Sequence, residues 1–202
     1  MRYATRPVLW ACMLLSMTAH GAAPATEAAE AAQGDALKAG VFTPAREAPD
    51  FSVLGSDGVA LTLSHYRGKV VVLGFGYTHC PNVCPATLAV LALAHRKLGA
   101  LGSQVQVVYL TVDPERDSPE RLKQFLAAFD PTFVGGTGSA AQMAAVRTSY
   151  GVTAQKVGTG SDYGIAHSSF IYLITREGKL RALMPFGHKA DDYVHDISML
   201  LN

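Results

Sequence analysis

The sequence predicts a single α/β domain whose mixed β-sheet is flanked by helices on both faces. Its 202 residues suit one domain of ordinary size plus a short extra segment. Hydrophobic residues make up 49% of the chain and charged residues only 16%, a balance typical of folded rather than disordered chains. Strand-like and helix-like segments alternate along the chain, which is typical of parallel βαβ units. A net charge of +1 argues against a nucleic-acid partner, and three cysteines are too few for a disulfide scaffold.

The N-terminal part of the chain predicts an export signal followed by a tether. Two arginines precede an apolar run at residues 8–19, and small residues follow it. This run is shorter than the roughly 20 residues that a membrane-spanning helix needs. We therefore expect a cleaved signal peptide at residues 1–21 rather than an uncleaved anchor, and export to the bacterial periplasm. Residues 22–47 are rich in alanine, so they are expected to form a flexible tether before a folded domain at 48–202.

The first half of the folded domain predicts a hairpin, a central strand and a helix. Residues 51–53 and 59–63, joined by a glycine-containing turn, predict a leading β-hairpin. The β-branched run at residues 70–75 is typical of a strand that is buried on both faces. Helix-forming residues fill positions 87–101, which predicts a long helix directly after this strand.

The second half completes a thioredoxin-like layout. Ser118 and Ser139 are each suited to cap the start of a helix. The elements expected here are a second buried strand (105–112), two helices (118–129 and 139–150), an antiparallel strand pair (170–175 and 180–184) and a final helix (190–201). The order predicts a thioredoxin-like mixed sheet with an N-terminal β-hairpin extension.

Two cysteines follow the predicted signal peptide, Cys80 and Cys84, in the segment GYTHCPNVCP. This segment leaves the carboxyl end of the central strand and enters a helix, where sites of open α/β sheets lie. The helix N-terminus favours the thiolate form, and the four-residue spacing lets both sulfurs face one side. A structural disulfide is disfavoured because closing so short a loop stabilises a protein by only roughly 2 kcal/mol. The pair therefore indicates redox or metal chemistry.

A histidine near this pair decides between redox and metal chemistry. Two thiolates alone suit redox chemistry, whereas two thiolates with an imidazole suit a soft ion, Cu(I) first among them. His167 ends a glycine-rich loop before the strand at 170–175, which should lie beside the strand at 70–75. It is therefore the leading candidate, ahead of His79. The histidines expected to be ordinary surface residues are His65, His95, His188 and His195.

Three segments resemble the Sco/SenC family, thioredoxin-like copper proteins that assist the assembly of cytochrome c oxidase. The segments are GFGYTHCPNVCP (74–85), YLTVDPERDSPERLKQFLAAFDPTFVGGTG (109–138) and DYGIAHSSFIYLITREGKL (162–180). Their order and spacing extend the resemblance over nearly all of residues 48–202. The three together are far more specific than the first alone.

The resemblance implies that Cys80, Cys84 and His167 ligate copper, as Cu(I) or Cu(II). It implies a metallochaperone for the dinuclear copper site of cytochrome c oxidase subunit II, with other copper carriers or thiol reductants as further partners. The alternative is a thiol–disulfide oxidoreductase, in which the two cysteines are catalytic and reduce that subunit before metal loading. Two positions depart from the family, which often has Asp at Asn82 and usually has Asp at Ala166. An aspartate at the second position could orient the imidazole.

Four further residues near these motifs have more ordinary interpretations. Asp113 and Asp117 are interpreted as a strand exit and part of a helix cap. Phe75 and Tyr77 flank the cysteine segment and are expected either to shield the site or to form a docking surface.

Overall fold

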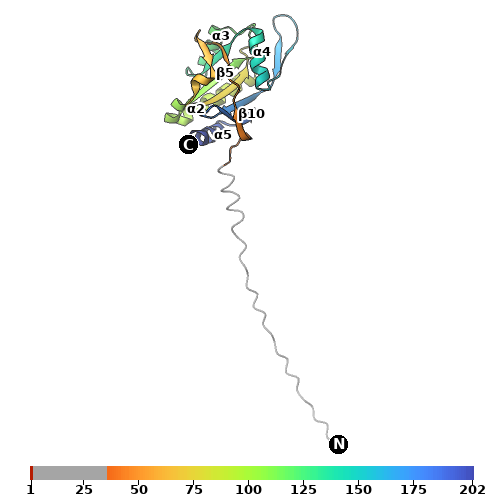
Figure 1. The fold of residues 1–202 in the computed structure, drawn as a ribbon. Coiled ribbons are helices and arrows are strands. Elements are labelled where there is room, and N and C mark those ends of the chain that lie inside the picture. Colours follow the sequence, from red (N-terminus) through yellow and green to blue (C-terminus); the bar gives the residue numbers. More distant parts are fainter. Residues whose placement is uncertain (2–35) are drawn as a thin grey trace. The chain divides into compact units, whose positions relative to one another are not determined.

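The structure is a computed structural model that describes residue 1 and residues 36–202. The strands are β1 (Gly40–Glu47), β2 (Ser52–Gly55), β3 (Ala60–Thr62), β4 (Val70–Gly76), β5 (Val105–Thr111), β6 (Val134–Thr137), β7 (Ala154–Val157), β8 (Gly164–His167), β9 (Phe170–Ile174) and β10 (Lys179–Pro185). The helices are α2 (Val83–Leu98), α3 (Pro119–Ala127), α4 (Ala140–Ser149) and α5 (Ala190–Leu201), with short 3-10 helices η1 (Leu63–Tyr66) and η2 (Gly99–Gln104). Residues Leu37–Asn202 form one compact unit (Figure 1).

An eight-stranded sheet forms the centre of this unit. Its strand order is β1-β10-β9-β4-β5-β6-β2-β3, and β7 pairs with β8 in a separate two-stranded sheet. Strands β4, β5 and β6 run parallel, whereas the other neighbours are antiparallel. The predicted mixed sheet with a β-hairpin extension, formed by β2 and β3, is therefore confirmed.

Strand β4 occupies the middle of the sheet, as its composition predicts. All seven of its residues are buried. It pairs with β5 on one side and with β9 on the other, so both of its edges are hydrogen-bonded. The prediction that the strand at 170–175 lies beside the strand at 70–75 is confirmed.

Helices cover both faces of the sheet. Successive side chains of a strand point to opposite faces, so neighbouring residues of β4 identify what packs on each side. A Cβ atom added at Gly76 would lie 2.9 Å from the sulfur of Cys84, so this face carries α2. Phe75 faces the other way and packs on Tyr150, the residue that ends α4, and on Tyr172 of β9. The prediction of helices on both faces is confirmed.

The helix ends follow the predicted caps with small changes in extent. The hydroxyl groups of Ser118 and Ser139 each accept a hydrogen bond from the backbone N–H three residues later. Helix α2 begins at Val83, four residues before the predicted start, because proline is tolerated in a first turn and Pro85 does not delay it. Helix α3 ends at Ala127, two residues before the predicted end.

The N-terminal boundary of the folded unit differs from the prediction. Residues 40–47, expected to belong to the flexible tether, form the edge strand β1 against β10. Just before it, the buried carboxylate of Asp196 accepts hydrogen bonds from the backbone N–H groups of Lys38 and Ala39, at 2.7 and 2.9 Å. These long-range partners hold a segment that is too poor in large apolar side chains to predict a strand by itself.

The remaining N-terminal predictions lie outside the described residues. The predicted signal peptide at 1–21 and most of the tether fall in residues 2–35, so both stay predictions. Within the described part of the chain, none of the helices combines the length and the hydrophobicity that crossing a bilayer requires.

Two further elements were absent from the predicted layout. Strand β6 contains Gly135 and Gly136, which are poor strand formers, yet a Cβ at Gly136 would lie 2.5 Å from Leu110. The close approach of the neighbouring strand therefore requires glycine there. Residues 157–167 were expected to form a glycine-rich loop, but residues 154–167 form the β7–β8 hairpin, which carries His167 at its end.

Candidate metal centre

The cysteine turn, residues 77–84, lies between the end of β4 and the first turn of α2. Cys80 is half-buried and Cys84 is buried. The backbone N–H of Cys84 donates a hydrogen bond to the sulfur of Cys80 at 3.5 Å. A Cβ at Gly76 would lie only 1.8 Å from the hydroxyl oxygen of Tyr109, so glycine is needed where β4 runs under this turn. The turn is thus held closely against the core of the sheet.

The β7–β8 hairpin brings His167 to this turn. Its Nε2 atom lies 3.6 Å from the sulfur of Cys84, although the two residues are 83 positions apart in the chain. Its Nδ1 atom lies 2.9 Å from the carbonyl oxygen of Ser168. A carbonyl can only accept, so Nδ1 carries the proton and Nε2 of the neutral ring directs its lone pair at the sulfur. This is the tautomer in which an imidazole ligates a metal.

The protonation of the three groups follows from their burial. Burial lowers the pKa of His167 and outweighs the opposing hydrogen bond to Ser168, which favours the neutral ring. Burial also raises the pKa of Cys84 to about 12. Burial alone would raise the pKa of Cys80 too, but hydrogen bonds from Cys84 and from the backbone of residues 82 and 83 lower it overall. Cys80 is therefore the more readily ionised thiol, and Cys84 needs a cation to become a thiolate.

Two of the three predicted ligands are in contact and the third is adjacent. Metal bonds of about 2.0 Å to nitrogen and 2.3 Å to sulfur can span the separation between His167 and Cys84. Within the described residues, no three His, Cys, Asp or Glu side chains already stand in a metal-holding arrangement. Coordination by all three groups therefore requires a rearrangement of side chains around the contact between His167 and Cys84.

Tyr77 connects the cysteine turn to the hairpin. Its ring meets the ring of His167 edge-on, with centroids 6.0 Å apart and planes at 79°. Its hydroxyl oxygen accepts a hydrogen bond from the backbone N–H of Ile165 at 3.1 Å. Tyr77 and Phe75 are each only 4% exposed, so they shield the interior and are not a docking surface.

Two other histidines of the described residues, His79 and His95, are directed at groups other than the cysteines. The Nδ1 atom of His79 lies 3.9 Å from a carboxylate oxygen of Asp117, so its ring is directed at the neighbouring loop. His95 was wrongly expected to be an ordinary surface residue. Its Nδ1 atom lies 2.9 Å from Asp130 and its Nε2 atom 3.1 Å from the carbonyl oxygen of Gly102, which ties α2 to the loops beside it.

The two departures from the family pattern have little bearing on how the imidazole is held. Ala166 is exposed and adjoins His167 in strand β8, so the two side chains point to opposite faces. The backbone carbonyl of Ser168 already orients the ring. Asn82 is exposed at the start of α2, and its side chain makes no capping hydrogen bond.

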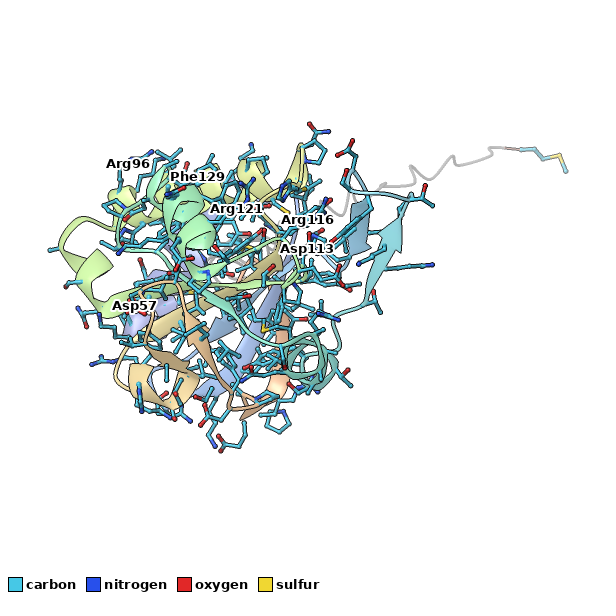
Figure 2. The ribbon with its side chains drawn as sticks, turned by 90° about the horizontal axis from the view of Figure 1, so that it is seen from above. Asp57, Arg96, Asp113, Arg116, Arg121 and Phe129 are labelled. Carbon is cyan, nitrogen blue, oxygen red and sulfur yellow. The ribbon has the colours of Figure 1, made fainter. Side chains whose placement is uncertain are left out.

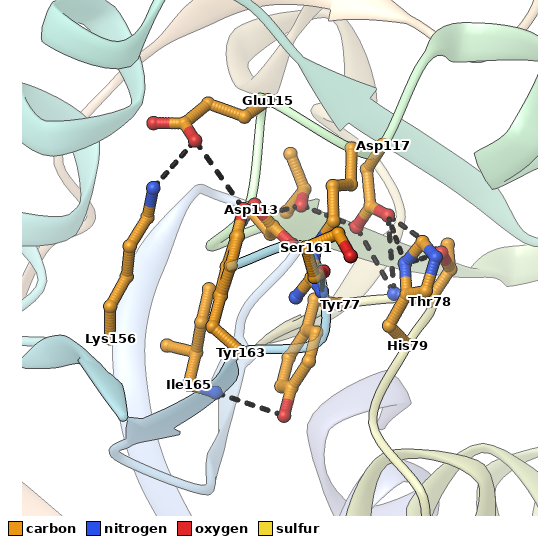
Figure 3. A network of polar contacts seen from close by, with 12 residues as sticks. Tyr77, Thr78, His79, Asp113, Glu115, Asp117, Lys156, Ser161, Tyr163 and Ile165 are labelled. Carbon is orange, nitrogen blue, oxygen red and sulfur yellow. Dashed lines mark hydrogen bonds and ion pairs between the residues drawn. The ribbon is translucent and has the colours of Figure 1, made fainter. Parts of the chain in front are cut away.

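Sequence reasoning missed the role of two carboxylates. Asp117 is fully buried and accepts hydrogen bonds from the backbone N–H and the hydroxyl of Thr78, at 3.1 and 2.6 Å (Figure 3). Asp113 is 1% exposed and lies beside Arg116, which donates to it at 2.5 Å (Figure 2). The motif DPERD was visible in the sequence, but only the fold shows that its two aspartates are buried while its glutamate is exposed.

The fold and the site together define a class of protein: a thioredoxin-like domain whose Cys-x-x-x-Cys pair is met by a histidine from a separate hairpin. Residues 42–202 match the family model described as SCO1/SenC. The chain belongs to this family.

Several similar proteins have been named or solved. The chain is 40% identical to Protein SCO2 homolog, mitochondrial, of Bos taurus over 133 residues, which are 64% of this chain and 50% of that protein. It spans about half the length of the curated relatives it matches. ScoI of Bradyrhizobium japonicum, solved with copper bound, is 35% identical, with a TM-score of 0.72 over 78% of this chain and 100% of that one. Apo Sco1 of Thermus thermophilus is 33% identical, with a TM-score of 0.75 over 82% and 98%.

Proposed function

We propose that this chain is a copper-binding metallochaperone in which Cys80, Cys84 and His167 ligate the ion. The observation that carries the proposal is the 3.6 Å contact of Nε2 of His167 with the sulfur of Cys84, made by the tautomer that ligates metals. Two sulfurs and one imidazole suit a soft ion, which favours copper and Cu(I) in particular. Copper-bound structures of the similar ScoI proteins of Bradyrhizobium japonicum and Arabidopsis thaliana support the same choice.

The client that fits this role is cytochrome c oxidase subunit II, at its dinuclear copper site. A protein with a similar fold, BsSco, is described as a member of the Sco family of cytochrome c oxidase assembly proteins. Cys80 is half-buried, so an incoming thiolate of the client can approach the ion from that side while Cys84 and His167 still hold it. Ligand exchange of this kind transfers the ion without releasing it into water.

The predicted signal peptide and tether fit delivery outside the cytoplasm. We propose that the domain acts in the bacterial periplasm, soluble or close to the membrane through its N-terminal segment. Other copper carriers or thiol reductants would then supply the ion or keep the two cysteines reduced, because an exported compartment is oxidising.

A titration of the reduced protein with Cu(I) against a chromogenic chelator tests the ligand set. Wild type should bind one ion per chain, and His167→Ala should weaken binding at least tenfold while the fold stays intact. His65→Ala is the matched control, because His65 is exposed on η1, and it should bind like wild type. Equal affinities of wild type and His167→Ala would remove His167 from the site.

The alternative function is thiol–disulfide exchange, and the asymmetry of the two thiols favours it as a second candidate. Cys80 is the more exposed and more acidic thiol, as an attacking thiol should be, and buried Cys84 would resolve the mixed disulfide. The dithiol would become a disulfide and pass two electrons and two protons to the client's disulfide. The copper-loaded form mixed with reduced subunit II, and the metal-free dithiol mixed with oxidised subunit II, separate the two roles. Copper transfer from the loaded form supports the chaperone, and reduction by the metal-free form without such transfer supports the reductase.

A further inference from the structure

We propose that Asp113 and Asp117 are positioning residues that fix His167 relative to the two cysteines through one buried hydrogen-bond network. This inference rests on the proposed function, because the groups that it positions are the proposed copper ligands. Both carboxylates belong to the segment that leaves the carboxyl end of β5, next to the end of β4. Neither touches a proposed ligand directly.

Asp117 holds the cysteine turn. Its carboxylate accepts hydrogen bonds from the backbone N–H and the hydroxyl of Thr78, which lies two residues before Cys80. It also accepts one from the hydroxyl of Thr111, at 2.6 Å. The Nε of Arg121 donates a hydrogen bond to the hydroxyl oxygen of Thr78 at 2.7 Å. The hydroxyl of Thr78 therefore accepts from Arg121 and donates to Asp117. These bonds fix the backbone at the point where the chain turns from β4 toward Cys80.

Asp113 holds the hairpin. One of its carboxylate oxygens accepts a hydrogen bond from the hydroxyl of Tyr163 at 2.7 Å, and the other accepts one from Nε of Arg116 at 2.5 Å. The same arginine donates Nη1 to the carbonyl oxygen of Ser161 at 3.1 Å, and its guanidinium lies 3.6 Å from the centre of the Tyr163 ring. Three contacts therefore hold Ser161 and Tyr163, the second of which lies directly before β8 and four residues before His167 (Figure 3).

Thr111 joins the two halves into one network. Its hydroxyl oxygen accepts the backbone N–H of Asp113 at 2.8 Å while the hydroxyl donates to Asp117. The connection from the half-buried Tyr163 to Thr78 therefore runs through hydrogen bonds of the buried residues Asp113, Thr111 and Asp117. Networks of this kind rigidify their surroundings where their members are satisfied, as both carboxylates are here, although Nη2 of Arg116 is buried without a partner.

The cost of this arrangement indicates what it does. Removing a carboxylate from water costs several kcal/mol, and packing alone does not need charges next to a ligand-bearing turn. The β7–β8 hairpin, in contrast, pairs only with itself and not with the main sheet. Its inner face is attached to the rest of the domain by side-chain bonds to residues 77 and 113–116 and by the packing of Ile165 into the hydrophobic core. The position of His167 therefore depends on them.

The test removes one hydroxyl from the network and follows copper binding. Tyr163→Phe deletes the bond to Asp113 but keeps the ring that stacks on Arg116. Its Cu(I) affinity should fall about tenfold, the lower end of what outer partners of a ligating histidine contribute. In a His167→Ala background the same substitution should change the affinity less than twofold, because its effect passes through the imidazole.

Two further readouts separate positioning from general stability. The Cu(II) form of Tyr163→Phe should show an altered EPR hyperfine coupling, and the metal-free protein should show faster amide exchange in β8 only. Tyr150→Phe is the matched control, since its hydroxyl also donates a hydrogen bond, in this case to the backbone carbonyl of Pro49, on the opposite face of the sheet. It should leave copper affinity and the spectrum unchanged. Asp113→Asn should weaken copper binding more than Tyr163→Phe does. If the Asp113→Asn variant fails to fold, the result for Tyr163→Phe still tests the inference.

The outcomes distinguish this inference from the function on which it rests. Copper binding by wild type, weakened by His167→Ala but unaffected by Tyr163→Phe, overturns the inference and leaves the proposed function standing. An equal loss for Tyr163→Phe with and without His167 also overturns it, because the effect would not act through the ligand. Failure of wild type to bind copper overturns the proposed function and this inference together.

Discussion

The cysteine turn and the β7–β8 hairpin supply the proposed ligands from two very different structural settings. The turn continues β4, a strand that is buried throughout and hydrogen-bonded along both edges. The hairpin is a two-stranded sheet with a largely exposed first strand, and side-chain contacts attach it to the domain. One ligand-bearing element is therefore part of the core, and the other is fastened to it.

This difference explains how the proposed metal site can hold its ligands accurately and still release an ion. Local stability varies within a protein, and elements with few buried contacts open at a lower free energy than the core. Two ligands on the rigid element keep a fixed spacing, whereas His167 can leave with the hairpin without unfolding the sheet. An element of this kind suits transfer of a cargo better than permanent binding.

The largest expected effect comes from the same substitution made in each region. Gly76→Ala places a Cβ 1.8 Å from the hydroxyl of the buried Tyr109, so the free energy of unfolding should fall by about 3 kcal/mol. Gly164→Ala in β8 meets nothing closer than 3.8 Å and should cost less than about 0.5 kcal/mol. Urea unfolding followed by circular dichroism measures both. Similar losses for the two variants would mean that the regions are equally constrained.

Hydrogen exchange tests the difference without any substitution. The amides of Val72 and Leu73 in β4 lie in the fully buried centre of the sheet and should exchange only on global unfolding. Those of β7 and β8 should open locally and exchange about 100-fold faster, which corresponds to about 2.7 kcal/mol. NMR or mass spectrometry of the metal-free protein gives the rates. Equal protection in the two regions would refute the idea of a fastened, mobile ligand.

The sequence predicted the rigid region better than the fastened one, for a physical reason. The β-branched run at 70–75 and the caps at Ser118 and Ser139 are local signals, and the elements they predict are present. The β7–β8 hairpin and β1 were missed because neither contains a continuous run of β-branched residues, and because the partner of β1, strand β10, is distant in the chain. Tertiary contacts override weak propensity in such segments.

The candidate site divides in the same way. The spacing of Cys80 and Cys84 is visible in ten residues of sequence. The proximity of His167 was inferred from the expected neighbouring strands and from family resemblance, and its contact with Cys84 agrees with that inference. Asp113 and Asp117 were interpreted as an exit and a cap, because no local pattern tells an outward carboxylate from one that turns into the core.

Alkylation of the two cysteines tests whether both belong to the rigid region. Cys84 is 2% exposed and burial raises its pKa to about 12, whereas Cys80 is half-buried with a lowered pKa. A lowered pKa gives more thiolate at a given pH, so the reaction of Cys80 should begin at a lower pH than that of an ordinary thiol. Iodoacetamide should modify Cys80 at least tenfold faster than Cys84 in the reduced, metal-free protein.

Peptide mass spectrometry across a pH series measures these two rates separately. Unfolding in guanidinium is the control, because both thiols should then react alike. Faster modification of Cys84 in the folded protein would place the boundary on the other side of the pair, with Cys84 belonging to the mobile region.

The weakest effect on stability is expected from the loss of the hydrogen bond that joins the backbone of β8 to the side chain of Tyr77. Tyr77→Phe removes the hydroxyl that accepts the N–H of Ile165 while leaving the ring against His167. One lost hydrogen bond should reduce the free energy of unfolding by about 1 kcal/mol. Tyr66→Phe on η1 deletes the same atom far from the hairpin and controls for loss of a tyrosine hydroxyl. If side-chain contacts attach the hairpin to an independently stable core, Tyr77→Phe should speed amide exchange in β8 and leave the exchange rates of β4 unchanged. Faster exchange in both would show instead that the hairpin and the core open as one unit.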